Sequence, residues 1–431
     1  MKNNPQTLRA WCIYDWANSA HALVIVSAIF PDYFVGVAQY NNTPYIPVFG
    51  YMVKNTVVFS YTIAISYGFI VLLNPYLSAL ADYSGHKKRF MQFFVTLGAL
   101  ACGALFFFTK ETQVLGIVAF GLSLVGFSGS MVFYNAYLPE IATEDRYDRL
   151  SAQGFALGFL GSVLLLCFNL SMILMPALYG GISEGLACRV SFLLTAVWWW
   201  GFAQYTLAYM PAGVALGTDT HIWQASTERR KRVWQAINAS KKDGSANLLR
   251  IFLIGFFFYT MGLQTVMYVA AIFGKSELHI KTDALIATVL VIQLVAIVGA
   301  LGMSQISNRW GNAYALRLTI VVWIGVCVSA YFINQTGFYV LAFVIGLLMG
   351  GTQSLSRSTF AKLMPINTPD KASYFAIYEL ADKLAIVFGT ASYALIEQIM
   401  GTARYSVVAL AVYFAIGGIV LLKLPSKKSY L

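Results

Sequence analysis

Long apolar runs recur along the whole chain and constrain its fold more than any other feature. A helix that crosses a bilayer needs about 20 predominantly apolar residues, and the sequence supplies twelve such runs separated by polar joints. Only 11% of the 431 residues are charged, whereas soluble chains carry about 25%. The sequence therefore predicts an all-α membrane protein with twelve transmembrane helices.

The predicted spans form two sets of six on either side of a long polar joint. They cover residues 12–38, 57–80, 91–109, 115–138, 152–177, 188–210, 249–272, 285–303, 315–333, 337–360, 372–398 and 403–423. We therefore expect an N-terminal six-helix half over residues 1–210, a central loop over 211–248 and a C-terminal six-helix half over 249–431.

The basic residues gather in alternate joints and predict the orientation. About 22 of the 29 Lys and Arg residues lie in the termini, the central loop and every second joint. Cytoplasmic loops carry such an excess, so both termini and the central loop should be cytoplasmic. This placement explains the net charge of +11, so the charge does not indicate nucleic-acid binding. We also find no nucleic-acid-binding motif.

The central loop contains a strongly basic segment, residues 228–235, which follows Trp223 and includes Trp234. A short helix lying in the headgroup layer, where membrane lipids would bind it, fits this composition. A solvated linker fits it equally well, so both alternatives remain open.

A repeat at an offset of 226 residues relates the two predicted halves. The matched positions are Asp82 and Asn308, Gly85 and Gly311, and Pro139 and Pro365. The same offset relates all three pairs of positions, which indicates a duplicated six-helix unit. Two parallel repeats of this kind are typical of transporters. Arg309, beside Asn308, supplies the basic charge of the second joint.

Ionisable residues inside the predicted spans are candidates for function because they are costly in a membrane. Asp15, Asn18 and Ser19 share one face of the first span. Glu379 and Lys383 are four residues apart in the eleventh span and can pair. A carboxylate in low dielectric takes up a proton more readily than one in water, which would couple transport to a proton gradient. Alternatively, Asp15 only anchors its helix near the surface.

Further polar residues in the spans complete the candidate site. His21 is expected either to carry protons or to form a neutral hydrogen bond to another helix. Polar amides are candidates for solute contact or for helix–helix association. The candidate solute or proton site is Asp15, Asn18, Ser19, His21, Asn135, Gln264, Gln353, Glu379 and Lys383. We expect no metal, no cofactor and no ATP-driven mechanism, since no Walker motif occurs.

The joint over residues 80–89, Leu-Ala-Asp-Tyr-Ser-Gly-His-Lys-Lys-Arg, resembles the major facilitator signature between helices two and three. Residues 14–20, 134–141 and 350–358 resemble the branch that contains the vacuolar amino-acid effluxer linked to autophagy and its bacterial relatives. This resemblance implies the major facilitator fold, a monomer in a bacterial inner (plasma) membrane, and secondary transport of a small polar solute such as an amino acid.

The same resemblance implies a cytoplasmic gate built from charges that separate when the two halves rock apart. The expected gate residues are Asp82, Gly85, Lys87, Lys88, Arg89, Glu140, Arg146, Asn308, Arg309, Gly311 and Arg357. A permease for sugar–peptide fragments of the cell wall shares this architecture and remains an alternative. A transport-inactive receptor or scaffold is a second alternative. Such a protein could have lost the gate charges, whereas this sequence retains Asp82, Glu140, Arg146 and Arg357. We find no motif of a membrane enzyme.

Overall fold

The computed structural model describes residues 2–48, 50–215, 222–238, 244–365 and 367–425, and nearly all of this part is helical. The long helices are α1 (Pro5–His21), α3 (Asn55–Ser84), α4 (Lys87–Ala104), α5 (Gln113–Ile141), α6 (Tyr147–Leu174), α7 (Glu184–Tyr209), α8 (Ile222–Asn238), α9 (Gly244–Ser276), α10 (Thr282–Trp310), α11 (Asn312–Ser329), α12 (Gln335–Leu363), α13 (Lys371–Met400) and α14 (Ala403–Leu421). A π-helix (Ala22–Ala28), α2 (Phe30–Val37) and a hairpin of β1 (Tyr45–Val48) and β2 (Tyr51–Lys54) lie between α1 and α3.

Most of these helices are long and apolar enough to cross a membrane. Among the described residues ten helices meet this condition by themselves, and α1 continued by α2 would be an eleventh. Each predicted span lies on a helix, so the prediction of a multi-pass helical membrane protein is confirmed. The remaining predicted span lies on α13, which carries Glu379, Asp382 and Lys383 near its middle and is therefore less apolar.

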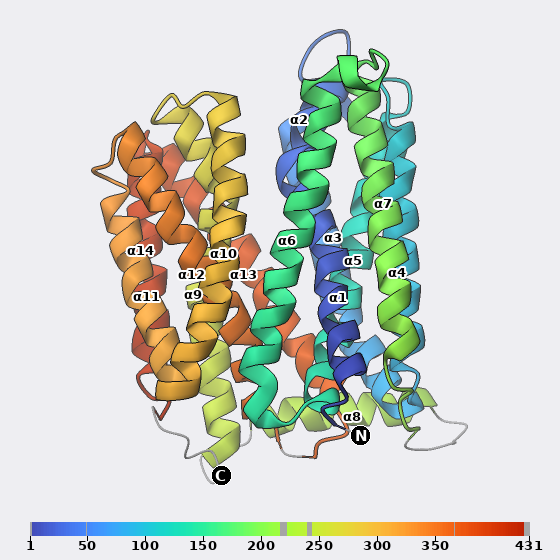
Figure 1. The fold of residues 1–431 in the computed structure, drawn as a ribbon, viewed down its shortest axis with the longest axis vertical. Helices are drawn as coiled ribbons and strands as arrows, with labels where there is room; N and C mark the ends of the chain where they lie inside the picture. The colour runs from blue at the N-terminus through green and yellow to red at the C-terminus, as the bar shows by residue number, and fades with distance from the viewer. Residues whose placement is uncertain (1, 49, 216–221, 239–243, 366, 426–431) are drawn as a thin grey trace.

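The helices gather in two groups that lie side by side in Figure 1. In the first group α1 packs against α6 and α7, and α4 packs against α5 and α7. In the second group α9 packs against α13 and α14, and α11 packs against α12 and α14. Counted from the start of each group of six, these neighbours correspond, which is the pattern that a duplicated unit produces.

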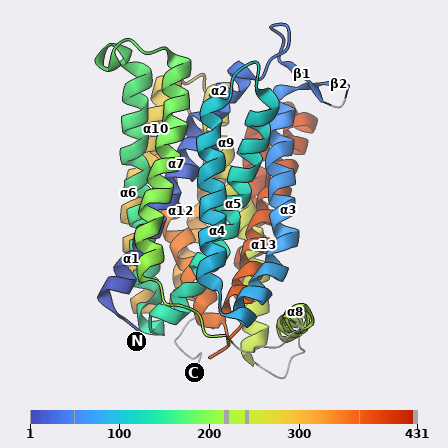
Figure 2. The same ribbon diagram turned by 90° about the vertical axis from the view of Figure 1, so that its right-hand side faces the viewer.

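The N-terminus marks one end of the bundle, which we call the lower end, as drawn in Figure 1. Helix α1 begins and α14 ends there, and α8 runs across it at right angles to the long helices. The central loop therefore contains a helix, as the first of the two alternatives requires. The Trp223 side chain lies outside the described part of the chain. The β1–β2 hairpin lies at the opposite, upper end (Figure 2).

The first span is broken near its middle. Ile29 N donates to Val24 O at 3.0 Å, a five-residue step that defines the π-helix. Pro31 follows within the first turn of α2, where it supplies no N–H and favours a new helix start. The axis bends by 43° between the two parts of this span.

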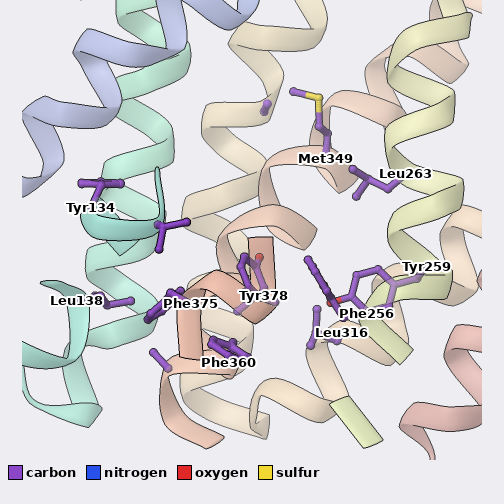
Figure 3. Close-up of a cluster of buried hydrophobic side chains, with 14 of the residues drawn as sticks. Tyr134, Leu138, Phe256, Tyr259, Leu263, Leu316, Met349, Phe360, Phe375 and Tyr378 are labelled. Carbon is purple, nitrogen blue, oxygen red and sulfur yellow. The ribbon is translucent and has the colours of Figure 1, made fainter. Parts of the chain in front are cut away.

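Apolar side chains close the boundary between the groups in its lower part. Figure 3 shows Leu138 of α5 beside Phe375 of α13, with Tyr378 and Phe360 next to them. Phe256 of α9 stacks on Tyr378 with 4.4 Å between ring centroids. Helix α13 is thus enclosed by both groups at this level, and charges that lie near it are shielded from water.

Candidate functional site

A buried ion pair joins the two helix groups. Arg357 of α12 places Nη2 2.9 Å from Oδ2 of Asp15 on α1, and Nη1 lies 3.4 Å from Oδ1. The side chains are only 2% and 4% exposed. Two parallel bonds between a guanidinium and a carboxylate form a strong and strictly oriented contact. Asp15 is therefore buried between the two groups rather than near the surface, and its partner is Arg357, which we expected in the gate.

Other groups fix the position of the Arg357 guanidinium. Its Nε donates to Ser151 Oγ at 2.9 Å, and its Nη2 donates to Ser151 O at 3.0 Å. The aromatic rings of Trp11 and Phe155 lie 4.6 and 4.3 Å from it, at cation–π distance. Gly154 on α6 leaves room for the paired carboxylate, because a Cβ there would lie 2.4 Å from its Oδ2.

Asn135 of α5 extends the contact to α13. Its Oδ1 accepts from Arg357 Nη1 at 3.5 Å, and its Nδ2 donates to Glu379 Oε1 at 2.9 Å. Both Asn135 and Glu379 are buried. A single amide therefore connects the ion pair to the charges in the middle of α13.

The charges of α13 form a cluster of their own. Lys383 Nζ lies 3.5 Å from Glu379 Oε2, so the predicted pair is present, but Asp382 Oδ2 is closer at 2.7 Å. Gln264 of α9 donates to Asp382 Oδ1 at 3.0 Å, and Lys383 Nζ lies 5.3 Å above the Tyr67 ring of α3. We call the connected set the central polar chain: Asp15, Arg357, Asn135, Glu379, Lys383, Asp382 and Gln264. Asp382 was absent from the predicted site.

The polar face predicted on the first span divides in the structure. Asp15 turns toward α12, whereas Asn18 Nδ2 lies 3.3 Å from the sulfur of Met131 on α5. Ser19 Oγ lies 3.5 Å from the neighbouring Asn18 Oδ1. Asn18 and Ser19 therefore lie beside the central polar chain and outside it.

His21 and Gln353 are also separate from the central polar chain. His21 is fully buried, its Nε2 lies 3.1 Å from Ser123 Oγ of α5, and its ring stacks on Phe127. This geometry matches the alternative of a histidine bonded to a neighbouring helix. Gln353 Nε2 lies 3.5 Å from the sulfur of Met267.

At the lower end, Asp82 of α3 holds the first turn of α13. Its carboxylate accepts from Ala372 N at 3.1 Å and from Ser373 N and Ser373 Oγ, both at 2.8 Å. The first N–H groups of a helix lack partners within the helix and carry partial positive charge. The expected gate residue therefore binds a helix N-terminus of the other group rather than a basic side chain.

A second carboxylate of the first group also binds residues of the second group. Asp148, in the first turn of α6, accepts from Ser307 Oγ at 2.9 Å, Asn312 Nδ2 at 2.7 Å and Lys362 Nζ at 2.6 Å. These three partners lie around the joint between α10 and α11 and at the end of α12. We did not predict Asp148, because an Asp in a polar joint has the sequence context of a solvated charge.

The expected gate residues of the second joint lie beside these contacts. Asn308 and Arg309 are exposed, and Arg309 lies over the neighbouring Trp310 ring. Gly311 connects α10 to α11 with a φ of +89°, and Gly85 ends α3 with a φ of +69°. The repeated glycines are thus explained, because both joints need a backbone conformation that side chains disfavour.

The remaining basic gate residues have different surroundings. Lys87 pairs with Glu140 of α5, and Lys371 Nζ of α13 lies 3.9 Å from the same carboxylate. Lys88 Nζ lies 3.5 Å from Met210 O. Arg89 and Arg146 are exposed, and no ion pair forms at either within the described ranges.

Comparisons with known proteins agree with this architecture. A family model described as "Vacuole effluxer Atg22 like" matches residues 3–430. The "Uncharacterized MFS-type transporter YxiO" of Bacillus subtilis (strain 168) is 32% identical over 431 residues, covering 100% of this chain and 97% of its own. "Autophagy-related protein 22" of Cryptococcus neoformans var. neoformans serotype D (strain JEC21 / ATCC MYA-565) is 27% identical over 288 residues, which are 62% of this chain and 48% of that protein.

A solved structure shows the same fold. The human organic anion transporter MFSD10 (TETRAN) superimposes with a TM-score of 0.70 over 98% of this chain and 100% of that chain, at 12% identity. The family model and the Bacillus relative confirm the resemblance drawn from the sequence, and the family is one of transporters. The chain belongs to the Atg22-like family of major facilitator transporters.

Proposed function

We propose that this protein moves a small polar solute across a bacterial plasma membrane by alternating access, as a single chain with a cytoplasmic lower end. The central polar chain carries this proposal, because it runs between the two helix groups through a buried part of the boundary. Charged groups in such a position are costly in a membrane, and they are therefore functional candidates by default. Amino acids are the solutes that the resemblance to the vacuolar effluxer implies.

The contacts at the lower end support a state that is closed toward the cytoplasm. Asp82 and Asp148 each bind residues of the opposite group, and the apolar cluster of Figure 3 brings Leu138 of α5 against Phe375 of α13. Release of solute into the cytoplasm requires these bonds to break while the groups rotate apart. The loss of two multidentate contacts is a cost that bound solute or a proton would offset.

The carboxylates of the central polar chain outnumber its cations, which favours binding of a proton or of a cationic group of the solute. It contains the carboxylates of Asp15, Glu379 and Asp382 but only the cations Arg357 and Lys383. One negative charge is left without a cation of its own. A proton or the ammonium group of a solute would neutralise it, and buried carboxylates in general take up protons readily. This supports coupling to a proton gradient.

We also infer that α13 is the twelfth membrane span. It packs against α3 and α5 of the first group and against α9 and α14 of the second. Glu379 and Lys383 are buried among these helices, so their charges face protein rather than lipid. Charged residues inside membrane spans are tolerated in this arrangement.

Transport of pooled labelled amino acids into proteoliposomes, with and without an imposed proton gradient, tests the proposal. We expect gradient-driven flux in the parent protein and its loss in Asp15→Asn and Glu379→Gln. Glu111→Gln is the matched control, because Glu111 is an exposed carboxylate in a connection at the upper end. This variant should transport like the parent.

The other outcomes separate the alternatives. Flux that survives both substitutions would contradict proton coupling and leave a facilitative carrier. Absence of amino-acid flux, with flux of sugar–peptide fragments, would favour the cell-wall permease. Absence of flux for every solute class, in protein that still binds solute, would favour the transport-inactive receptor, although the retained charges of the lower end count against it.

A further inference from the structure

Helix α8 connects the two groups at the lower end. Arg229 places Nη2 2.5 Å from Oδ1 of Asp370, the residue that precedes α13. The guanidinium of Arg230 lies 4.0 Å above the Tyr76 ring of α3. Val233 and Ile237 continue the same buried face. One face of α8 therefore contacts both the first and the second group.

The other side of α8 is exposed and basic. Lys231 and Arg232 are exposed, and Trp234 is 40% exposed. Glu228 is the single acidic residue between 222 and 238, against four consecutive cations from Arg229 onward. Because Arg229 and Arg230 already have partners in the protein, Lys231 and Arg232 provide the charge of the free face.

The position of α8 brings this face to the level of a membrane surface. The helix runs at right angles to the long helices at their lower ends (Figure 1), and Figure 2 shows it nearly end-on at the rim of the bundle. If the long helices cross the bilayer, α8 lies parallel to its plane. An exposed Trp beside Lys and Arg is typical of helices in the headgroup layer, where anionic lipids attract basic residues.

We propose that the exposed face of α8 binds anionic phospholipid headgroups, with Lys231 and Arg232 as the charged contacts and Trp234 in the adjoining interface. A free phosphate would use the two cations alone, whereas a lipid also uses the indole ring. This is a lipid site separate from the central polar chain, so its test does not depend on transport.

Quenching of Trp234 fluorescence by brominated lipids tests this site. The full-length protein is reconstituted into vesicles of phosphatidylcholine with phosphatidylglycerol, and bromine is placed on the acyl chains of one lipid or the other. The difference between the parent protein and Trp234→Phe isolates the emission of this residue. We expect brominated phosphatidylglycerol to quench that emission at least about twofold more than brominated phosphatidylcholine, because each basic residue attracts anionic lipid.

Charge variants decide whether Lys231 and Arg232 cause the preference. The double variant Lys231→Gln/Arg232→Gln should lower the quenching ratio to about one, as should high salt, which screens exposed charges. Lys54→Gln/Lys110→Gln removes two exposed lysines of the upper end and should leave the ratio unchanged. Equal quenching by both lipids in the parent protein would overturn the proposal. Preserved preference in the Lys231→Gln/Arg232→Gln variant would overturn it too. Inorganic phosphate that abolishes the preference, where chloride at the same ionic strength does not, would also overturn it and assign the face to free anions.

Discussion

Lys362 of α12 donates to Asp148 of α6 across the boundary between the two groups, with 2.6 Å between Nζ and Oδ2 and only 1% of the Asp148 side chain exposed. Asp82 mirrors this contact, because it joins the end of α3 to the first turn of α13. In each case a carboxylate links a helix joint of one group to the beginning of a helix in the other group. The lower end is thus closed by two related contacts.

Replacement of Asp148 by Asn should open the lower end. The variant keeps an acceptor oxygen but loses the charge that faces Lys362, and a hydrogen bond to a charged group contributes about 1.5–3 kcal/mol. The measurement is the distance between spin labels at His86→Cys and Asn308→Cys, both exposed, in a Cys167→Ser background. We expect a larger fraction of molecules to show a longer distance between the two labels. Glu144→Gln, an exposed carboxylate of the preceding turn, should change nothing.

Asp82→Ala should favour the open lower end as well. It removes three hydrogen bonds and the attraction between a carboxylate and a helix N-terminus, which is worth about 0.3–1 kcal/mol at exposed sites and more when partly buried. The same spin-label pair measures the change. Because the two contacts lie on different helices, the effects of Asp82→Ala and Asp148→Asn should be roughly additive. A double variant no more open than either single variant would show that one contact already controls closure.

Arg357→Met should destabilise the whole protein. Removal of one partner from a buried pair leaves an uncompensated charge, at a cost of about 3–5 kcal/mol. We expect a lower melting temperature in detergent and partial recovery in the double variant Asp15→Asn/Arg357→Met, which neutralises both groups. A double variant less stable than Arg357→Met would contradict the pairing, since neutral Asn could then not relieve any cost.

Gly85→Ala should be costlier than Gly180→Ala. The two glycines have nearly the same φ, +69° and +73°, but a Cβ at Gly85 would lie 2.5 Å from Ala215 N, whereas no atom lies within 4 Å at Gly180. Both variants incur about 1–2 kcal/mol for the left-handed conformation. The additional loss of thermal stability in Gly85→Ala reports the contact between the joint and the segment that leads to α8. Equal losses would mean that this segment moves aside freely.

The sequence predicted helices, charged candidates and the pair of Glu379 and Lys383 within one helix, but it could not predict which charges meet across the two groups. Apolar runs locate the spans because length and hydropathy are local properties. Asp15 and Arg357 are 342 residues apart, so only the packing of α1 against the second group brings them together. Arg357 looks like a gate residue because it lies near the lower end of α12. Side chains on a helix lean toward its N-terminus, which for α12 is at the upper end, so the guanidinium reaches the buried ion pair instead.

The charges of α13 make insertion of this helix costly unless its partners are already in the membrane. An isolated helix with Asp or Lys at its centre enters the bilayer at a cost of about 2.5–3.5 kcal/mol per charge. Translation produces α3, α5 and α9 before α13, so Tyr67, Asn135 and Gln264 are already in the membrane when their charged partners emerge. A C-terminal half expressed alone would lack the first two of these residues. It should insert α13 poorly until the N-terminal half is supplied in the same cell.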